Sequence, residues 1–433
     1  MNTGRNMKRS LFVIVAIVIL APLAVIGIQL ASNPGSDHTS VLPANAAEQI
    51  KRGEYLARAG NCMSCHTARG GSKYAGGRAI ATPFGSVYTS NITPDNETGI
   101  GKWTADDFWR AIHNGKSKDG TFLYPAFPYP NYTKVTRADA DAIFAYFKTI
   151  PPVRQANKEH ELGFPYNQRI LLAFWRTLYF TPGEFQADAT ASPQLNRGAY
   201  LVQGLGHCAA CHTARNALGG TVAEGDLAGG MIPMQNWYAS SLTSDSGSGI
   251  GTWDAKDIAD LLKTGVSRRD AVFGPMAEVV SGSLQHLEQS DIDSMAVYLK
   301  SIASTKGGHD QQAETTPSNG EATLRQGAKL YEQLCVECHK ANGQGIPPAY
   351  PSLAANQSLS ADSALNPIRI VLNGGYPPST AGNPRPYGMP PFGSTLNDVE
   401  VAAVVSYIRT SWGNKGGLVS PIVVGRSRGA PIE

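Results

Sequence analysis

"CMSCH", residues 62–66, sets two cysteines three positions apart and places a histidine directly after the second. Three kinds of site use such spacing: a redox-active dithiol, one half of a zinc site, and the covalent attachment site of a haem. The same pattern recurs as "CAACH" at 208–212 and as "CVECH" at 335–339. Together the three stretches contain all six cysteines of the 433-residue chain, so every thiol belongs to one C-x-x-C-H pattern.

The C-x-x-C-H pattern favours haem over the other two kinds of site. One helical turn brings the two sulfur atoms to the same side, where they can bond to the two vinyl groups of the macrocycle, and the following histidine offers a ring nitrogen to the iron. A zinc site needs four ligands from two pairs of suitable separation, whereas these pairs lie far apart in the chain. A redox dithiol has no need of the histidine each time. The sequence therefore predicts three covalently bound haem c groups.

The sequence around each pattern also repeats. A short run typical of a helix precedes each pattern and carries a glycine, and an amphipathic segment with an aromatic residue near its end lies downstream. Because glycine has no side chain to hinder close approach, we expect the first and last helices of each repeat to cross at these glycines. The glycines are Gly53, Gly198 and Gly327, and the downstream segments are 139–150, 291–302 and 398–411.

A further loop is shared by the first two repeats. "TGIGKW" ends at Trp103 and "SGIGTW" ends at Trp253, and each precedes a helix that Thr104 or Asp254 would cap. Two interpretations stay open: the indoles lie near haem propionates, or they are core residues beside a tight turn. A buried indole N–H needs a hydrogen-bond partner in either case, so this need does not distinguish the two. The third repeat has a Pro/Gly-rich stretch in place of this loop, which makes it the divergent one.

A methionine thioether is the usual second axial ligand in electron-transferring c-type haem proteins. In the second repeat "FGPMAEV" presents Met276, and in the third "YGMPPF" presents Met389, in both cases shortly before the last helix. The flanking prolines stiffen these loops, so we predict both methionines as iron ligands. Met231 and Met234 fit less well because they come too early in the repeat, and Met295 because it lies within the last helix.

The first repeat breaks this pattern. In the aligned stretch "FLYPAFPYPNY" at 122–132, Phe127 stands where Met276 stands in the second repeat. Met63 lies inside the attachment stretch on the proximal side, and phenylalanine cannot bind iron. We expect an open or weakly occupied sixth position at the first haem, with His113 as the second choice. Weaker candidates are Tyr124, Tyr129, Tyr132, Lys116 and Lys118.

The N-terminal sequence predicts export to the periplasmic side of the cell membrane. Arg5, Lys8 and Arg9 precede the uncharged apolar segment Leu11–Ala31. At about 1.5 Å per residue such a segment spans a hydrocarbon core of about 30 Å, and its basic flank would stay in the cytoplasm. A cleaved signal peptide is the alternative, since "ANAAEQ" at 44–49 offers small residues for cleavage. The apolar length favours an uncleaved anchor, because the apolar part of a signal peptide usually has only about 7–15 residues.

The composition excludes one class of partner and suggests the domain boundaries. Charged residues are sparse and the net charge is only +3, so we predict no binding to nucleic acid. We predict an anchor or signal peptide with its tether at 1–47, haem domains at 48–155, 191–303 and 321–413, a connecting helical linker at 156–190, a flexible linker at 304–320, and a loosely ordered tail at 414–433.

With these motifs in place, the chain resembles the tri-haem cytochrome c subunits of membrane-bound bacterial dehydrogenases over roughly residues 48–413. The resemblance implies an all-α fold of three tandem class I cytochrome c-like haem domains after an N-terminal apolar helix. Where Phe127 stands, the family normally has a methionine. The resemblance implies attachment through Cys62, Cys65, Cys208, Cys211, Cys335 and Cys338, proximal ligands His66, His212 and His339, and distal ligands Met276 and Met389.

The resemblance also implies a function. Subunits of this family serve quinoprotein alcohol dehydrogenases, flavin-dependent gluconate, sorbitol or fructose dehydrogenases, and molybdenum-dependent aldehyde or nicotinate dehydrogenases. The partner's catalytic subunit would oxidise the substrate, and this chain would pass the electrons through three haems to membrane ubiquinone or a terminal oxidase. Two alternatives depend on Phe127: a peroxidase-like haem enzyme with His113 as its acid/base group, and a gas-binding cytochrome.

Overall fold

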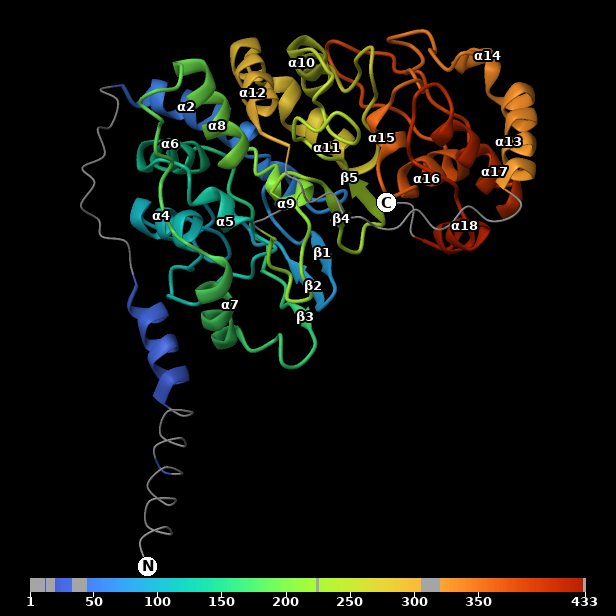
Figure 1. The fold of residues 1–433 in the computed structure, drawn as a ribbon. Helices are drawn as coiled ribbons and strands as arrows, with labels where there is room; N and C mark the ends of the chain where they lie inside the picture. Colours follow the sequence, from blue (N-terminus) through green and yellow to red (C-terminus); the bar gives the residue numbers. More distant parts are fainter. Residues whose placement is uncertain (1–11, 13–19, 33–44, 223–225, 305–319, 431–433) are drawn as a thin grey trace, which may run out of the picture.

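Each C-x-x-C-H stretch lies in a short helical turn that follows the first helix of a repeat. The computed structural model describes residues 12, 20–32, 45–222, 226–304 and 320–430. Figure 1 shows the helices in three groups set in a row, with the second group in the middle. We name these groups by their outer helices: the first repeat (46–147), the second repeat (193–301) and the third repeat (320–410).

The helices and strands have the following bounds. The first repeat contains α2 (Ala46–Ala59), α3 (Cys62–Cys65), α4 (Ala105–Asn114), α5 (Tyr129–Tyr132), α6 (Arg137–Phe147), β1 (Ala79–Thr82) and β2 (Gly85–Tyr88). The second contains α8 (Pro193–Gln203), α9 (Ala209–His212), α10 (Ala255–Thr264), α11 (Gly274–Gly282), the 3-10 turn η3 (Leu284–His286), α12 (Gln289–Ser301), β4 (Gly230–Ile232) and β5 (Trp237–Ala239). The third contains α13 (Gly320–Leu334), α14 (Val336–His339), α15 (Gln357–Ser360), α16 (Leu365–Asn373) and α17 (Asp398–Thr410). Between the first two repeats lie β3 (Glu161–Leu162), the 3-10 turn η1 (Arg169–Leu171) and α7 (Leu172–Tyr179), and α18 (Pro421–Arg428) follows the third.

The first and last helices of each repeat cross at the glycines that the sequence singles out. The crossing pairs are α2 with α6, α8 with α12, and α13 with α17. A Cβ added at any of the three glycines would overlap a backbone carbonyl group of the opposite helix, so the predicted crossings are confirmed. Gly53 faces Ala142, Gly198 faces Ser294, and Gly327 faces Ala403.

The two predicted helix caps behave differently. Thr104 forms a capping box on α4: its Oγ1 accepts from the backbone N–H of Asp107 (3.1 Å), and Asp107 Oδ2 accepts from the backbone N–H of Thr104 (3.0 Å). Asp254 stands at the cap position of α10 but its side chain makes no capping hydrogen bond, and it pairs instead with Arg268. The prediction is confirmed for Thr104, whereas Asp254 marks only the place where α10 begins.

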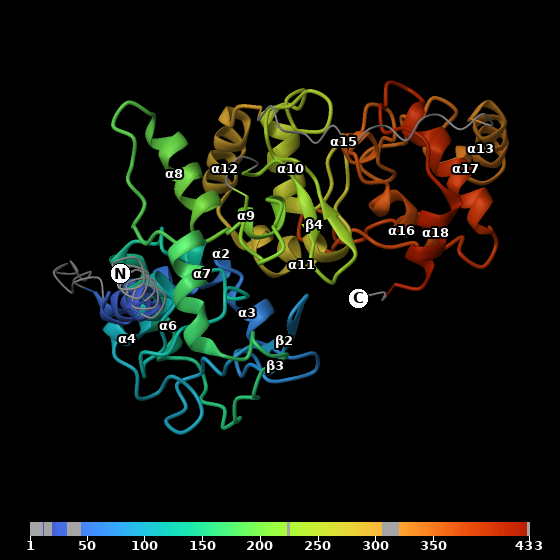
Figure 2. The ribbon, with the colours of Figure 1, turned by 60° about the horizontal axis from the view of Figure 1, so that its bottom comes forward.

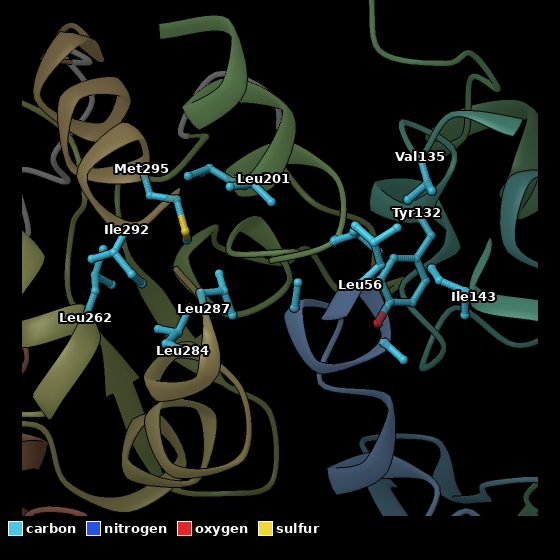
Figure 3. Packing of buried hydrophobic residues seen from close by; sticks show 14 of the residues in the cluster. Leu56, Tyr132, Val135, Ile143, Leu201, Leu262, Leu284, Leu287, Ile292 and Met295 are labelled. Carbon is cyan, nitrogen blue, oxygen red and sulfur yellow. The ribbon is translucent and has the colours of Figure 1, made fainter. Parts of the chain in front are cut away.

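The first two repeats share one hydrophobic core. A continuous cluster joins Leu56 of the first repeat to Leu201 and Ile292 of the second, and Figure 3 shows the two sides of this cluster. The third repeat has a separate cluster that includes Ile368 and Val401. We therefore expect the first two repeats to unfold together and the third to open independently.

In the described part of the chain, two small antiparallel hairpins accompany the helices of the expected all-α fold. β1 pairs with β2, β3 adds to β2, and β4 pairs with β5. In both repeats the hairpin follows the C-x-x-C-H stretch, and its last strand ends just before a serine. β2 ends two residues before Ser90, and β5 ends directly before Ser240. The hairpins therefore place the carbonyl groups of these serines beside the histidines of the attachment turns.

The connecting segment and the tail differ from their expected structure. Within 156–190 only η1 and α7 are helical, and the remainder is strand or irregular. The C-terminal tail holds α18, whose Val424 is fully buried and whose Arg428 Nε donates to Asp398 Oδ1 (2.9 Å). The glycine-rich composition of the tail concealed this helix, which is stabilised by packing against α16 and α17.

The predicted apolar helix at 11–31 falls partly outside the described residues. Of it the structure describes residue 12 and residues 20–31, and the latter are helical; we call residues 20–31 the N-terminal helix. Among the described residues no helix is both long enough and apolar enough to cross a membrane.

Candidate haem-attachment sites

The three histidines of the C-x-x-C-H stretches share one hydrogen-bonding arrangement. The Nδ1–H of His66 donates to the Ser90 carbonyl (2.7 Å), and that of His212 donates to the Ser240 carbonyl (2.6 Å). His339 Nδ1 lies 3.3 Å from the Pro351 carbonyl. Because a carbonyl can only accept, each ring carries its proton on Nδ1 and leaves the lone pair of Nε2 for a metal. This arrangement fits a proximal iron ligand.

Burial supports the same role for these histidines. Burial lowers the pKa of His66, His212 and His339, and in each case the hydrogen bond to the backbone carbonyl opposes the shift. The neutral imidazole is the form that binds iron.

The thiols do not fit the redox-dithiol interpretation. Burial raises the pKa of Cys62 and of Cys208 to about 12, and that of Cys335 to about 11. A reactive dithiol needs a lowered thiol pKa, which a neighbouring positive charge or a helix N-terminus supplies. As for zinc, no group of three or more His, Cys, Asp or Glu side chains in the described parts of the chain could hold a metal ion.

The two predicted distal methionines pack against the cores that hold the cysteines of their repeats. Met276 lies in the first turn of α11, and it packs with Cys208 against the shared core. Met389 is held by backbone hydrogen bonds to Gly375 in both directions (2.8 and 3.0 Å), and it packs with Cys335 against the core of the third repeat. Both positions are compatible with an iron ligand.

The other methionines of the second repeat lie elsewhere. Met231 and Met234 are exposed, which is unsuitable for a buried iron ligand. Met295 is 1% exposed on α12 and belongs to the shared core, where Figure 3 shows it beside Leu201 and Ile292. These positions agree with the low rank that the sequence gives to all three.

In the first repeat, Phe127 packs where a distal ligand is expected. Its ring contacts Tyr132 with 5.3 Å between ring centroids, and it lies against the shared core together with Cys62. His113, the second choice as a ligand, is buried and stacks on Trp109 at 4.3 Å. His113 Nδ1 also lies 3.5 Å from the Thr133 hydroxyl. His113 is thus held by its own neighbours.

The weaker ligand candidates are also engaged elsewhere. The Tyr132 hydroxyl donates to the Gly60 carbonyl (2.9 Å), and the Tyr124 hydroxyl donates to the Tyr166 carbonyl (2.9 Å). Tyr129 is enclosed by aromatic side chains and Arg176, Lys116 donates to the carbonyls of Leu30 and Ser32, and Lys118 donates to the Lys102 carbonyl. These contacts support an open sixth position at the first site.

Both loop tryptophans pack against the shared core. Trp253 is 2% exposed, and Trp103 is half-buried. The core interpretation therefore holds for both rings, and a contact with haem propionates stays a prediction.

Sequence reasoning missed the contact that joins the first two sites. Arg78 donates from Nη1 to the Ser64 carbonyl inside the first attachment turn (2.6 Å), and from Nη2 to Glu278 Oε2 (2.9 Å). Glu278 lies on α11, the helix that carries Met276. The proximal side of the first site thus packs on the distal helix of the second, and only the fold reveals this pairing.

The second and third repeats also meet at their distal loops. A Cβ added at Gly375, the residue bonded to Met389, would lie 3.2 Å from the Phe273 ring at the start of α11. Asn366 holds Tyr238 through two hydrogen bonds, Tyr238 N–H to Asn366 Oδ1 (2.9 Å) and Asn366 Nδ2 to the Tyr238 carbonyl (2.8 Å). The second site is therefore in contact with the surroundings of both others.

Known proteins support the assignment made from the motifs. A family model described as cytochrome c matches residues 50–151 and 324–412. The chain is 42% identical to the gluconate 2-dehydrogenase cytochrome c subunit of Pantoea cypripedii, over 84% of this chain and 86% of that protein. It is 40% identical to the cytochrome c subunit of alcohol dehydrogenase (quinone) from Gluconobacter oxydans, over 89% and 83% of the two chains. It is 35% identical to the fructose dehydrogenase cytochrome subunit of Gluconobacter japonicus, over 92% and 86%.

Proposed function

The chain belongs to the family of cytochrome c subunits of dehydrogenase complexes, and from this premise we propose that it carries electrons through three covalently bound c-type haems. The electrons come from a partner dehydrogenase. The acceptor we propose is membrane ubiquinone or a terminal oxidase, on the periplasmic side of the cell membrane. The observation that carries the proposal is the repeated arrangement of His66, His212 and His339, each with Nδ1 directed at a backbone carbonyl. These names of relatives favour the relay over the peroxidase-like and gas-binding alternatives.

Each repeat forms one haem domain in this proposal, with the boundaries predicted from the sequence. The six cysteines attach the haems, and Met276 and Met389 supply the sixth ligands of the second and third. The sixth position of the first is open beneath Phe127, because the neighbouring histidine, tyrosines and lysines have other partners. Haem iron supplies reversible one-electron exchange at each site.

The chain's own residues determine how the sites communicate. Arg78 and Glu278 hold the first attachment turn against α11, and the two hydrogen bonds between Asn366 and Tyr238 hold the third repeat against the second. Electrons therefore pass between the first and third sites by way of the second. Partial burial lowers the pKa of His66 and His212, which favours the neutral imidazole that binds iron.

The partner is a dehydrogenase catalytic subunit of quinoprotein, flavoprotein or molybdenum type. Relatives are named as subunits of gluconate, quinone-dependent alcohol, fructose and nicotinate dehydrogenases, so an alcohol, sugar acid or aldehyde is the substrate class we propose. The chain itself does not oxidise the substrate in this proposal.

The test combines haem counting with respiration. Purified full-length protein should contain three haems per chain by pyridine haemochrome assay, and His66→Ala should alter the spectrum of one haem only. Deleting the gene should abolish dehydrogenase-linked oxygen uptake while the dehydrogenase still reduces an artificial dye. Fewer than three haems in the wild type, or unchanged oxygen uptake in the deletion, would overturn the proposal.

A further inference from the structure

Two buried cations of the first repeat region hold the N-terminal helix. The side chains of Lys116 and Arg176 are 1% and 2% exposed. Lys116 Nζ donates to the carbonyls of Leu30 (3.1 Å) and Ser32 (2.6 Å) at the end of that helix. Arg176 Nε donates to Gln29 Oε1 (3.1 Å). We call Lys116 and Arg176 the cation clamp.

The N-terminal helix supplies acceptors to both residues of the cation clamp, and the Asn114 carbonyl also accepts from Arg176 Nη1 (2.5 Å). No carboxylate in the described parts of the chain forms an ion pair with Lys116 or Arg176, and each is surrounded by aromatic rings or cations. The last carbonyls of a helix have no partner within it and carry its partial negative charge. A buried cation without acceptors is strongly unfavourable, and the N-terminal helix provides acceptors to both cations, so this helix packs against the first repeat and α7.

An apolar surface lies beside the clamped helix. Phe164 and Leu178 are 82% and 66% exposed, and Ile170 and Leu171 are 42% and 41% exposed. We call these four residues the apolar belt. They lie on α7, on η1 and just before it. Large exposed apolar side chains gathered in one region are typical of a surface that meets another apolar phase.

The apolar belt and the N-terminal helix lie at the same end of the molecule. Gln29 Nε2 donates to Thr177 Oγ1 on α7 (3.1 Å), which joins the two elements directly. Figures 1 and 2 both show α7 next to the N-terminal helix, which leads away from the first repeat. The exposed side chains of that helix include Leu20, Leu23 and Ile28, so its surface is apolar as well.

We propose that the apolar belt rests in the interfacial layer of a lipid bilayer, beside the place where the N-terminal segment enters it. This inference rests on the membrane association in the proposed function. Lipid fits better than a protein partner because α7, which carries part of the belt, is bonded to the N-terminal helix, and the sequence Leu11–Ala31 is uncharged and matches a hydrocarbon core in length. Apolar side chains at such a surface insert to the boundary between headgroups and acyl chains. In Figure 1 the row of repeats runs across the axis of the N-terminal helix, so the three repeats would lie along the bilayer surface, with the first repeat beside the belt.

Photolabelling from lipid tests this contact with the full-length protein. The chain is reconstituted into vesicles of phosphatidylethanolamine and phosphatidylglycerol that contain a trace of phospholipid with a diazirine near the headgroup, and the labelled peptides are identified by mass spectrometry. We expect label in the N-terminal segment and in the peptide 163–180. The matched internal control is the third repeat, where Tyr376 and Tyr387 are 71% and 59% exposed and should stay unlabelled.

A triple variant separates the apolar belt from the anchor. Phe164→Ser with Leu171→Ser and Leu178→Ser should lower the label in 163–180 by about tenfold and leave the N-terminal label unchanged. Label confined to the N-terminal segment of the wild type overturns the proposal. So does label in 163–180 that disappears when the dehydrogenase subunit is bound, since the face would then be a protein contact. Haem content measured on the same samples tests the proposed function separately. If the belt does not meet lipid, the label in 163–180 is absent but the chain still contains three haems.

Discussion

The helix crossing in the third repeat gives the sharpest test of how the sequence specifies this fold. Gly327 on α13 faces the backbone of Ala403 on α17, and a Cβ there would overlap the Ala403 carbonyl oxygen and press on the Cβ of Tyr407. We therefore consider Gly327→Ala, which adds one methyl group at the point of closest approach. The third repeat is suitable because its hydrophobic cluster is separate from the core of the other two.

The expected magnitude is the difference between two opposing effects. Alanine is better than glycine within a helix by about 1 kcal/mol. An extra carbon in a close-packed contact costs about 1–3 kcal/mol, and more where the surroundings cannot adjust. The obstacle here is a backbone carbonyl, which cannot rotate away as a side chain can, so the upper end applies. The net loss is about 2 kcal/mol of local stability, equivalent to an increase of about thirtyfold in the opening constant.

Native-state hydrogen exchange measures this loss at the right place. Amides of α13 and α17 in Gly327→Ala should exchange about thirtyfold faster than in the wild type, with the first two repeats unaffected. Gly429→Ala is the matched control, because a Cβ at Gly429 meets nothing within 4 Å and the backbone φ of −83° suits alanine. Exchange in α13 and α17 that is unchanged or slower in Gly327→Ala would refute the crossing as the reason for the glycine.

Three further predictions address the sites and their contacts. Phe127→Met should supply the missing thioether to the first haem. Carbon monoxide should then change the dithionite-reduced spectrum of one haem in the wild type and of no haem in the variant. If it changes no haem in the wild type, the first site is not open. Burial raises the pKa of Asp270 above 3.8, and its carboxylate accepts from the Ser358 hydroxyl (2.8 Å) across the boundary of the second and third repeats. The folded state therefore binds this proton more tightly than the unfolded state, so the local stability is greatest below the ordinary pKa and falls as pH rises through the raised value. Exchange at α15, corrected for intrinsic rates, should show this trend, and Asp270→Asn should remove it. Thr104→Ala removes the capping box of α4 and should cost about 1 kcal/mol, seen as faster exchange in α4 alone, while an unchanged α4 would mean that tertiary contacts hold its first turn.

The sequence predicts the features that depend on local spacing. The pentapeptide pattern identifies each attachment turn, and the glycines before it identify the helix crossings, because both requirements are met by residues at fixed positions in one repeat. The rank order of methionines follows from the same repeat. The structure agrees with this order, because Met231 is exposed and Met295 lies in the hydrophobic core.

The features that the sequence could not predict depend on contacts between distant segments. α18 lies in a glycine-rich tail with little helical pattern, and the packing of Val424 stabilises it. The hairpins that place the carbonyls of Ser90 and Ser240 have strands of only three or four residues, too short for an alternating pattern. The cation clamp is invisible for another reason: Lys116 resembles a surface lysine until the fold brings the end of the N-terminal helix to it.

The row of repeats and the apolar belt together constrain how electrons can reach the membrane. The second repeat separates the first from the third, and each neighbouring pair is held by polar contacts that a slide of one repeat would break, such as Arg78 with Glu278. If the apolar belt meets the bilayer, the first haem belongs to the repeat beside the belt, and it is also the one whose sixth ligand Phe127 replaces. A haem without a thioether has a lower potential than its methionine-ligated neighbours, because methionine stabilises the ferrous state. The first site would then differ from the other two in its ligand, its potential and its place beside the belt. Phe127→Met would change the ligand and the potential of this site and leave its place unaltered.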